Sequence, residues 1–471
     1  MKFPPGLNWL GALAIAAVVI AGGTWSLVPQ FRTQVVGVIH EKGGVSGSGT
    51  GPSAGVTGSG NTTSAQTAAQ AANPSSFQCA AGRNGGATDV GVTATSINLA
   101  STLAESGIGA SFLGDARYGM LAVVNQVNRQ GGICGRRLNL NLVDDGWNAT
   151  TGESDIRNFI AEKYFALAVV PSSEGLNAAS NSSDIDSAGI PVIGTDGMLN
   201  SQYKDPWIWP VAASTVSTAH IAALSAYRAG SRTFGIVYDK DYRFGPEGAT
   251  AFAAAVSRLG GQLKASIGIR SGQQSYSSEV NTFVQSCGPC DMTFMLLEPD
   301  TAIAWIKSDQ SSGHYIFGSK RTAGPQPLFV SSFGQACGQL CNNMWVWTGY
   351  QAPYPPFDGT AADADYVNAI RSVSGNADVA NQFLEGAYVG MRLLVQALQT
   401  VGPDLTRARL KAALDSMTFD SGLTNPLTWQ PGNHFANTAM LGFTIQYSQG
   451  FNGFQYQQTG WVKDPWALQD H

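Results

Sequence analysis

The side chains of this sequence that are best suited to hold a small polar molecule stand directly after short apolar runs. Hydroxyls and carboxylates orient such a ligand by hydrogen bonding, and aromatic rings exclude water from it. The candidates are Ser172, Ser173, Glu174, Gly175, Asp196 and Gly197 earlier in the chain, and Tyr242, Phe244 and Glu298 later in it. In an open parallel sheet, ligands bind at the carboxyl ends of the strands. The pattern therefore predicts a ligand site formed by two facing rims.

Purely structural roles also explain these residues. Ser172 and Thr195 can cap helices, and Tyr242 and Phe244 can pack in a core. The paired acids of Asp144–Asp145 can be solvated turn residues. The sequence leaves these alternatives open.

Residue patterns of enzymes are scarce. None of the five histidines pairs with a Cys, Asp or second His at metal-ligand spacing, so we expect no metal site, no cofactor and no catalysis. Gly51–Gly55 matches the GxSxG pattern of hydrolases, but it lacks the strand and helix that a nucleophile elbow requires. Gly107–Gly114 has Phe112 where a dinucleotide-binding loop needs its third glycine. That loop can still offer backbone N–H groups to an anionic ligand group.

The six cysteines are Cys79, Cys134, Cys287, Cys290, Cys337 and Cys341. Their spacing suggests the disulfides 287–290, 337–341 and 79–134, although spacing does not fix the connectivity. One alternative is a redox site at CGPC, but such a site opens a helix after a strand, and here a helix precedes and a strand follows. A four-cysteine zinc site is the other alternative. Disulfides fit an extracytoplasmic location.

The N-terminus predicts a membrane segment. Leu7–Val28 is almost wholly apolar, and no charge interrupts Pro4–Gln30, a length that spans a bilayer as a helix. An uncleaved anchor and a cleavable signal peptide both fit residues 1–32, and we favour the anchor. Residues 33–78 are rich in Gly, Ser and Thr, which predicts a flexible tether. Both interpretations place the rest of the chain outside the cytoplasm.

Length and charge narrow the class of protein further. The 471 residues are too many for one core, so two or more lobes are expected. The net charge is -5 and no Lys/Arg cluster stands out, which argues against a nucleic-acid partner. Charged residues make up 13% of the chain, below the usual ~25%, as suits an extracytoplasmic protein that handles small ligands.

Strands and helices alternate from Ile97 onward, which predicts parallel sheets covered by helices on both faces. The expected strands are Ile97–Thr102, Arg137–Asp144, Leu167–Pro171 and Pro191–Gly194, then Thr233–Tyr238, Gln262–Ile269, Met292–Leu297 and Leu328–Ser331. The expected later helices are Val216–Ala229, Phe244–Leu259, Ser275–Gln285, Asp300–Gln310 and Asn381–Val401. Residues 427–462 read as short antiparallel strands.

Two changes of lobe are expected, near residues 207–217 and 325–332. Residues 88–211 then form the first part of lobe I, 212–326 form the first part of lobe II, and 327–471 return to complete both lobes.

The stretch from Asp115 to Asp145 combines a helix, a turn and a strand. Its apolar residues fall on one helical face, Asp115 can cap the helix, and Gly131-Gly132 can end it. The strand that follows ends at Asp144 and Asp145, and Trp147 beyond it lines the cleft or covers its outer edge.

These segments together resemble the type I periplasmic binding proteins, specifically the branched-chain amino-acid (leucine/isoleucine/valine) receptor family of ABC importers. The resemblance runs from about Ile97 to Tyr447. It is carried, in family order, by INLASTLAESGIGASFLGDARYGMLAVVNQVNRQGGICGRRLNLNLVDDG, AVVPSS, GIPVIGTDG, GIVYDKDYRFGPEGA and LFVSSFG. It implies an α/β fold with two lobes, each a parallel sheet flanked by helices, joined by three crossovers and closing over a ligand.

The resemblance also implies ligand-binding residues. They are the Ser172–Gly175 turn with Asp196 and Gly197 on the first lobe, and Phe244 and Gln273 on the second. Phe112 falls where the family often has an aromatic lid. Phe244 replaces the usual Tyr, and Gln273 stands where amino-acid binders commonly carry an acid that pairs with the ligand ammonium. A neutral Gln pairs poorly with a cation, so an amide, a carboxylate or an aromatic acid also fits.

The implied function is that of a solute-binding receptor of an ABC importer, which captures a small polar metabolite by hinge closure and is not an enzyme. Its expected partners are the ligand, an ABC permease and, through the N-terminal helix, the membrane. An alternative is a membrane-tethered sensing ectodomain that reports to a signalling partner. A third, an enzyme on the same fold, requires a nucleophile–base pair that the sequence does not contain.

Overall fold

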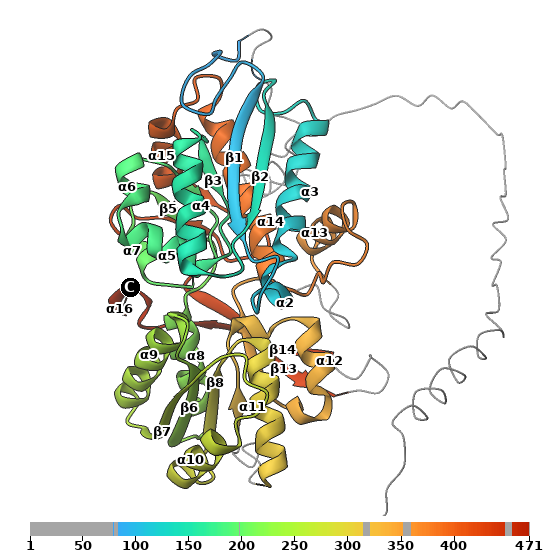
Figure 1. The fold of residues 1–471 in the computed structure, drawn as a ribbon. Helices are drawn as coiled ribbons and strands as arrows, with labels where there is room; N and C mark the ends of the chain where they lie inside the picture. The colour runs from blue at the N-terminus through green and yellow to red at the C-terminus, as the bar shows by residue number, and fades with distance from the viewer. Residues whose placement is uncertain are drawn as a thin grey trace, which may run out of the picture. The chain divides into compact units, whose positions relative to one another are not determined.

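The computed structural model describes residues 79, 83–196, 198–313, 321–351, 359–447 and 455–470. These residues form two α/β lobes, each around its own sheet (Figure 1). The predicted membrane anchor and tether, and also Gly197, lie outside the described residues. In the part of the chain that the structure describes, no helix combines the length and the apolar character needed to cross a membrane.

Lobe I is built on a parallel sheet with the strand order β2-β1-β3-β4-β5. Its strands are β1 (Ser96–Leu103), β2 (Arg137–Asp144), β3 (Ala166–Ala168), β4 (Val192–Ile193) and β5 (Ile208–Trp209). Its helices are α2 (Ala110–Leu113), α3 (Ala116–Arg129), α4 (Ala149–Ala161), α5 (Ser173–Asn181), α6 (Asp184–Ala188), α7 (Ser201–Lys204), α13 (Ala361–Arg371), α14 (Gln382–Val401) and α15 (Arg407–Ser416). Separate cores on its two faces, around Met120 and Leu394 and around Ile156 and Leu176, show that helices cover both sides.

Lobe II is built on a larger sheet with the order β14-β13-β10-β9-β8-β6-β7. Its strands are β6 (Thr233–Asp239), β7 (Gln262–Ile269), β8 (Met292–Leu296), β9 (Thr322–Ala323), β10 (Trp345–Thr348), β13 (Ala439–Gln446) and β14 (Gln455–Lys463). Its helices are α8 (Thr215–Arg228), α9 (Phe244–Arg258), α10 (Ser277–Cys287), α11 (Pro299–Ser312) and α12 (Ser331–Cys337), with 3-10 turns at η3 (Gln326–Leu328) and η4 (Gly338–Cys341). β13 runs antiparallel to β10 and β14, as expected for the tail.

One predicted strand is wrong. Leu328–Ser331 is apolar, but its first residue ends the turn η3 and its last begins α12. Pro325 and Pro327 directly precede this stretch, and proline cannot donate to a strand ladder. The second change of lobe is also misplaced, because β9 and β10 both lie in the larger sheet, so the chain leaves lobe II only after Thr348.

The sequence predicted the C-terminal end of α3 correctly but not the capping of its N-terminal end. Gly131 and Gly132 follow the helix with φ of 97° and 76°, a conformation that favours glycine. Asp115 stands before the helix but makes no side-chain capping bond. Its Oδ2 accepts from the backbone N of Asp378 at 3.0 Å, so it ties α3 to the segment before α14.

All three predicted disulfides are present, joining Cys79 to Cys134, Cys287 to Cys290 and Cys337 to Cys341. The CGPC pair lies at the end of α10 and is followed by β8. The helix therefore precedes the pair, opposite to the order in which a redox CxxC opens a helix.

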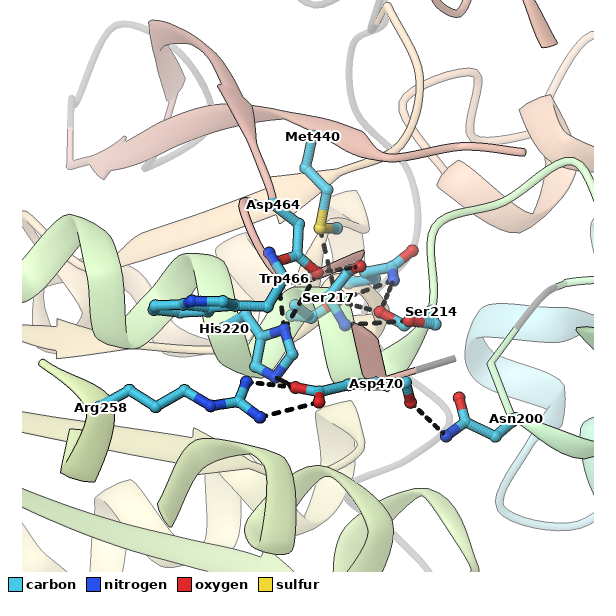
Figure 2. A network of polar contacts seen from close by, with 11 residues as sticks. Asn200, Ser214, Ser217, His220, Arg258, Met440, Asp464, Trp466 and Asp470 are labelled. Atoms are coloured by element: carbon cyan, nitrogen blue, oxygen red, sulfur yellow. Dashed lines mark hydrogen bonds and ion pairs between the residues drawn. The ribbon is translucent and has the colours of Figure 1, made fainter. Parts of the chain in front are cut away.

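The C-terminal segment is fastened to lobe II by buried polar contacts (Figure 2). His220 of α8 is fully buried; its Nδ1 lies 3.0 Å from Asp464 Oδ2 and its Nε2 lies 3.1 Å from Asp470 Oδ2. Asp470, in the short helix α16 (Ala467–Asp470), also pairs with Arg258 of α9. Ser217 donates to Asp464 at 2.6 Å, not to His220, so the trio lacks the hydroxyl–imidazole bond of a nucleophile and its base.

Candidate functional site

Five aromatic side chains from both lobes meet between the carboxyl ends of the two sheets. We call Phe112, Trp147, Tyr242, Phe244 and Phe383 the aromatic cluster. Trp147 of lobe I stacks on Tyr242 of lobe II, with ring centroids 4.0 Å apart and 11° between the ring planes. The ring centroids of Phe244 and Trp147 are 6.0 Å apart. Phe112 meets Trp147 edge-on at 5.3 Å and Phe383 at 5.4 Å.

The loop after β2 aims Trp147 at lobe II. Asp145 Oδ1 accepts from the Trp147 backbone N at 2.8 Å, and Oδ2 accepts from Thr102 Oγ1 at 2.7 Å. Trp147 itself has φ 59°, which few non-glycine residues adopt. Asp144 accepts from the backbone N of Glu105, Ser106 and Gly146. The paired acids therefore shape this loop, and Trp147 lines the region between the lobes.

The Ser172–Gly175 turn opens α5 beside Trp147. Ser173 Oγ lies 3.4 Å from Trp147 Nε1, which donates to it. Glu174 Oε1 accepts from the backbone N of Arg243 at 2.9 Å, which is a direct hydrogen bond between the lobes. Burial raises the pKa of Glu174. Ser172 occupies the N-cap position but makes no side-chain capping bond.

Gly175 lies at a close crossing of two helices. A Cβ on Gly175 would lie 2.6 Å from the Cα of Gly152 in α4. The residue thus permits the close crossing of α4 and α5, and nothing in its surroundings requires a ligand.

Asp196 follows β4 and is buried. Its Oδ1 accepts from the backbone N of Met198 at 3.2 Å and from Gln202 Nε2 at 3.0 Å. Burial raises the pKa of Asp196 to about 7, although the two hydrogen bonds oppose the shift. Thr195 donates to Gln202 Oε1 at 2.7 Å and caps no helix.

A small cavity lies next to Asp196, at the junction of β3, β4 and α14. It is lined by Pro171, Thr195, Asp196, Tyr350, Gln382 and Phe383, among others, and has room for about one water molecule. Tyr350 Oη and Gln382 Oε1 are buried and find no hydrogen-bond partner among the described residues. Because buried polar atoms are nearly always paired, these two mark a place where a partner is missing.

On lobe II, Phe244 is the fully buried first residue of α9. Burial raises the pKa of the half-buried Tyr242 to about 12. Glu298 is fully buried and caps α11, accepting from the backbone N of Asp300 at 2.8 Å and of Thr301 at 2.7 Å. Burial raises the Glu298 pKa to about 7. The backbone N of Gln273 donates to Tyr276 Oη.

The first turn of α14 contributes residues that the sequence analysis missed. Gln382 and Phe383 follow the N-cap Asn381, whose side chain accepts from the backbone N of Phe383 and Leu384. Asn381 Nδ2 also donates to Phe112 O at 2.9 Å, joining this turn to the aromatic cluster. The sequence predicts a helix over Asn381–Val401, and only its place at the first turn distinguishes Phe383 from the core residues further along.

Three comparisons with known proteins bear on the fold. Residues 96–451 match the family model described as periplasmic binding protein. No curated protein matches the chain. Many solved structures do.

The names of three of these solved structures include a small-molecule ligand. A fatty acid ABC transporter substrate-binding protein from Thermomonospora curvata has a TM-score of 0.67 and 16% identity, covering 82% of this chain and 97% of that one. An R. palustris solute-binding protein in complex with 4-hydroxybenzoate has a TM-score of 0.69 and 16% identity, with coverages of 80% and 100%. A leucine binding protein from Thermotoga maritima has a TM-score of 0.65 and 15% identity, with coverages of 78% and 99%. At such identities the likeness establishes the fold alone.

Proposed function

The chain belongs to the periplasmic binding protein family, and from that membership we propose that it is the solute-binding receptor of an ABC importer. The family is one of extracytoplasmic binding proteins. The observation that carries the proposal is the convergence of Trp147 from lobe I with Tyr242 and Phe244 from lobe II, at the sheet edges where α/β proteins bind ligands.

The mechanism follows from which contacts cross between the lobes. The Trp147–Tyr242 stack and the bond from Arg243 N to Glu174 exist only when the lobes are together. Rotation of one lobe about the connecting segments separates both contacts and opens the region between them. A solute that enters there meets rings and carboxyl groups, and closure removes it from water.

We propose that the ligand contacts Phe112, Ser173, Glu174, Asp196, Tyr242 and Phe244, together with Trp147 and Phe383. The ligand is a small metabolite, such as an amino acid, an amide or an organic acid. The named relatives bind fatty acids, 4-hydroxybenzoate and leucine, so the fold accommodates several ligand classes. Phe244 and Gln273 in place of the family's Tyr and acid weaken the case for a branched-chain amino acid.

The membrane anchor and the tether at residues 1–78 are part of the same proposal. They would hold the receptor beside its permease, where tethering raises the effective concentration of one partner near the other.

A thermal-shift screen of the purified protein against amino acids, amides, amines and organic acids tests the proposal. A ligand at a hundred times its dissociation constant stabilises the folded protein by about 2.7 kcal/mol. Asp196→Ala should abolish that shift while the variant remains folded by circular dichroism. A ligand that binds Asp196→Ala as tightly as the parent would show that the site lies elsewhere.

A further inference from the structure

The region between the lobes holds several deeply buried carboxyl groups. Five carboxyl groups surround the aromatic cluster and are at most 7% exposed: Asp145, Glu174, Asp196, Asp239 and Glu298. In the described part of the chain, none of them forms an ion pair with a Lys, Arg or His side chain. Buried charges are normally paired or held neutral, so this concentration of acids calls for an explanation.

Three of the five are accounted for by the backbone around them. Asp145 orders the loop that carries Trp147. Asp239 accepts from the backbone N of Asp241 at 2.9 Å and from the Ser271 hydroxyl. Glu298 caps α11.

Asp196 and Glu174 also accept N–H bonds, from Met198 N and Gln202 Nε2 and from Arg243 N, and both stand at the junction of the lobes. Ser173 connects them to the aromatic cluster, since it contacts both Trp147 and Asp196. On the facing lobe, Arg243 is exposed, and it is its backbone N that donates to Glu174.

Two independent features indicate which ligand group would pair with Asp196 and Glu174. The faces of aromatic rings attract cations, Trp most strongly, and five rings converge here. Tyr350 Oη and Gln382 Oε1, beside Asp196, are oxygen atoms without a donor among the described residues. An N–H-bearing cation supplies both the missing charge and the missing donors.

Resting on the proposed receptor function, we propose that the solute is a protonated amine with an apolar or aromatic body. Its ammonium group faces Asp196 and Glu174, and its body lies against the aromatic cluster. A metal ion is the competing source of positive charge. However, the described residues contain no group of three or more His, Cys, Asp or Glu side chains arranged to hold one.

The proposal has a consequence for pH. The titratable groups that influence Asp196 are Glu174 on α5, Tyr203 on α7 and Tyr350 after β10. Burial raises the Asp196 pKa to about 7, so the carboxyl group is partly protonated near neutral pH, and an ammonium group that pairs with it displaces that proton. Amine affinity should therefore rise as pH increases from 6 to 8, whereas the affinity of an anion should fall.

Isothermal titration of the purified full-length chain tests this with probes of matched shape. Phenethylamine and isoamylamine are the cations, 3-phenylpropanoate is the anion of similar shape to phenethylamine, and leucine is the zwitterion. We expect at least one amine to bind with proton release, and 3-phenylpropanoate not to compete. Asp196→Asn keeps an oxygen for Met198 N and Gln202 Nε2 and should weaken amine binding at least about tenfold, the equivalent of about 1.4 kcal/mol.

A matched control separates this effect from general damage. Asp205 is another buried acid of lobe I, which accepts from Ser180 Oγ at 2.8 Å and the backbone N of Trp207 at 2.9 Å. Asp205→Asn should leave amine binding unchanged.

The outcomes also separate this proposal from the receptor function. Binding of the anion or of leucine without either amine would overturn the cation proposal and leave the receptor function standing. Amine binding that Asp196→Asn does not weaken would overturn the proposed site. Failure of both amines in a protein that binds no member of the wider screen would count against the cation proposal and the receptor function together.

Discussion

Asp196 and Glu298 are both deeply buried carboxyl groups, but the bonds around them differ. Asp196 uses one oxygen, Oδ1, to accept from both Met198 N and Gln202 Nε2. Glu298 uses one oxygen for each of its two backbone donors. An amide can replace the first arrangement and not the second, because its NH2 group cannot accept from a backbone N–H.

This difference predicts that replacing each acid by its amide changes stability by different amounts. Since the Asp196 pKa rises from 3.8 to about 7 on folding, the folded state holds a proton that the unfolded state loses between about pH 4 and 7. The free energy of unfolding therefore falls as pH rises through that range and stays low above it. Asp196→Asn cannot ionise, so we expect it to be more stable than the parent by roughly 1–3 kcal/mol at pH 8, and nearly equal to it at pH 4. Urea unfolding at both pH values measures this.

Glu298→Gln supplies the contrast. Its ionisation cost disappears as well, but one bond to the α11 N-terminus is lost, which costs roughly 1 kcal/mol. Its gain at pH 8 should be the smaller of the two. An unchanged pH slope in Asp196→Asn would mean that Asp196 is ionised in the folded protein at neutral pH.

Trp147 shows where prediction at the scale of single residues stops. The sequence placed it near the cleft but could not tell an inward ring from an outer cover. Its direction is set by the positive φ of 59° and by the bond from its backbone N to Asp145. Both depend on the three-dimensional path of the loop, which no local pattern encodes.

At the scale of elements, the crossing of α4 and α5 depends on two glycines. Gly152 and Gly175 face each other so closely that a Cβ on either would lie within 2.8 Å of the other's backbone. Gly175 was predicted to contact the ligand, yet its environment is a helix–helix contact.

Gly175→Ala should therefore destabilise the fold by about 1–3 kcal/mol, because the added methyl group must push the helices apart. Gly375→Ala is the control, since no atom lies within 4 Å of its added Cβ, and it should be neutral within about 0.5 kcal/mol. Chemical unfolding of the two variants measures the difference. Equal stabilities would show that the two helices can shift at little cost.

Long periodic elements were predictable and short ones were not. The helix expected at Phe244–Leu259 is α9 (Phe244–Arg258), and the strand expected at Gln262–Ile269 is β7 with the same bounds. In both cases the apolar period is sustained over many residues. β10 (Trp345–Thr348) escaped prediction because its position is fixed by pairing with β9 and β13, which are distant in sequence.

At the scale of the whole molecule, the contacts of the C-terminal segment join parts of the chain that are far apart in sequence. His220 lies between Asp464 and Asp470, and Asn200 of lobe I donates to the backbone O of Asp470 at 3.3 Å. Nothing in the spacing of the five histidines foretold this contact, because its carboxyl partners lie more than 240 residues away.

His220→Ala should lower the free energy of unfolding by about 3 kcal/mol, because it leaves two carboxyl groups without their buried partner. Arg258→Ala removes a partner of Asp470 that is 37% exposed and should cost less than about 1 kcal/mol. Thermal and urea unfolding measure both losses. A His220→Ala variant no less stable than Arg258→Ala would show that the buried contacts contribute little.

The two-lobed architecture followed from the alternation of strands and helices and from the resemblance. The second position at which the chain changes lobes was not predicted correctly. The prolines near residue 325 suggested a lobe boundary, but the chain stays within the larger sheet there. The ligand-binding rims stay a prediction, and the sequence analysis did not include the first turn of α14, which lies almost 200 residues beyond Asp196 in the chain.

The 4.0 Å stack of Trp147 on Tyr242 gives the molecule an intrinsic spectroscopic signal of lobe closure. An indole and a phenol held this close couple their ultraviolet transitions, and because they belong to different lobes the coupling ends when the lobes part. The near-ultraviolet dichroism of the parent minus that of Trp147→Phe isolates this signal from the other ten of the 11 tryptophans. Opening and closing can thus be timed in solution without attaching a dye.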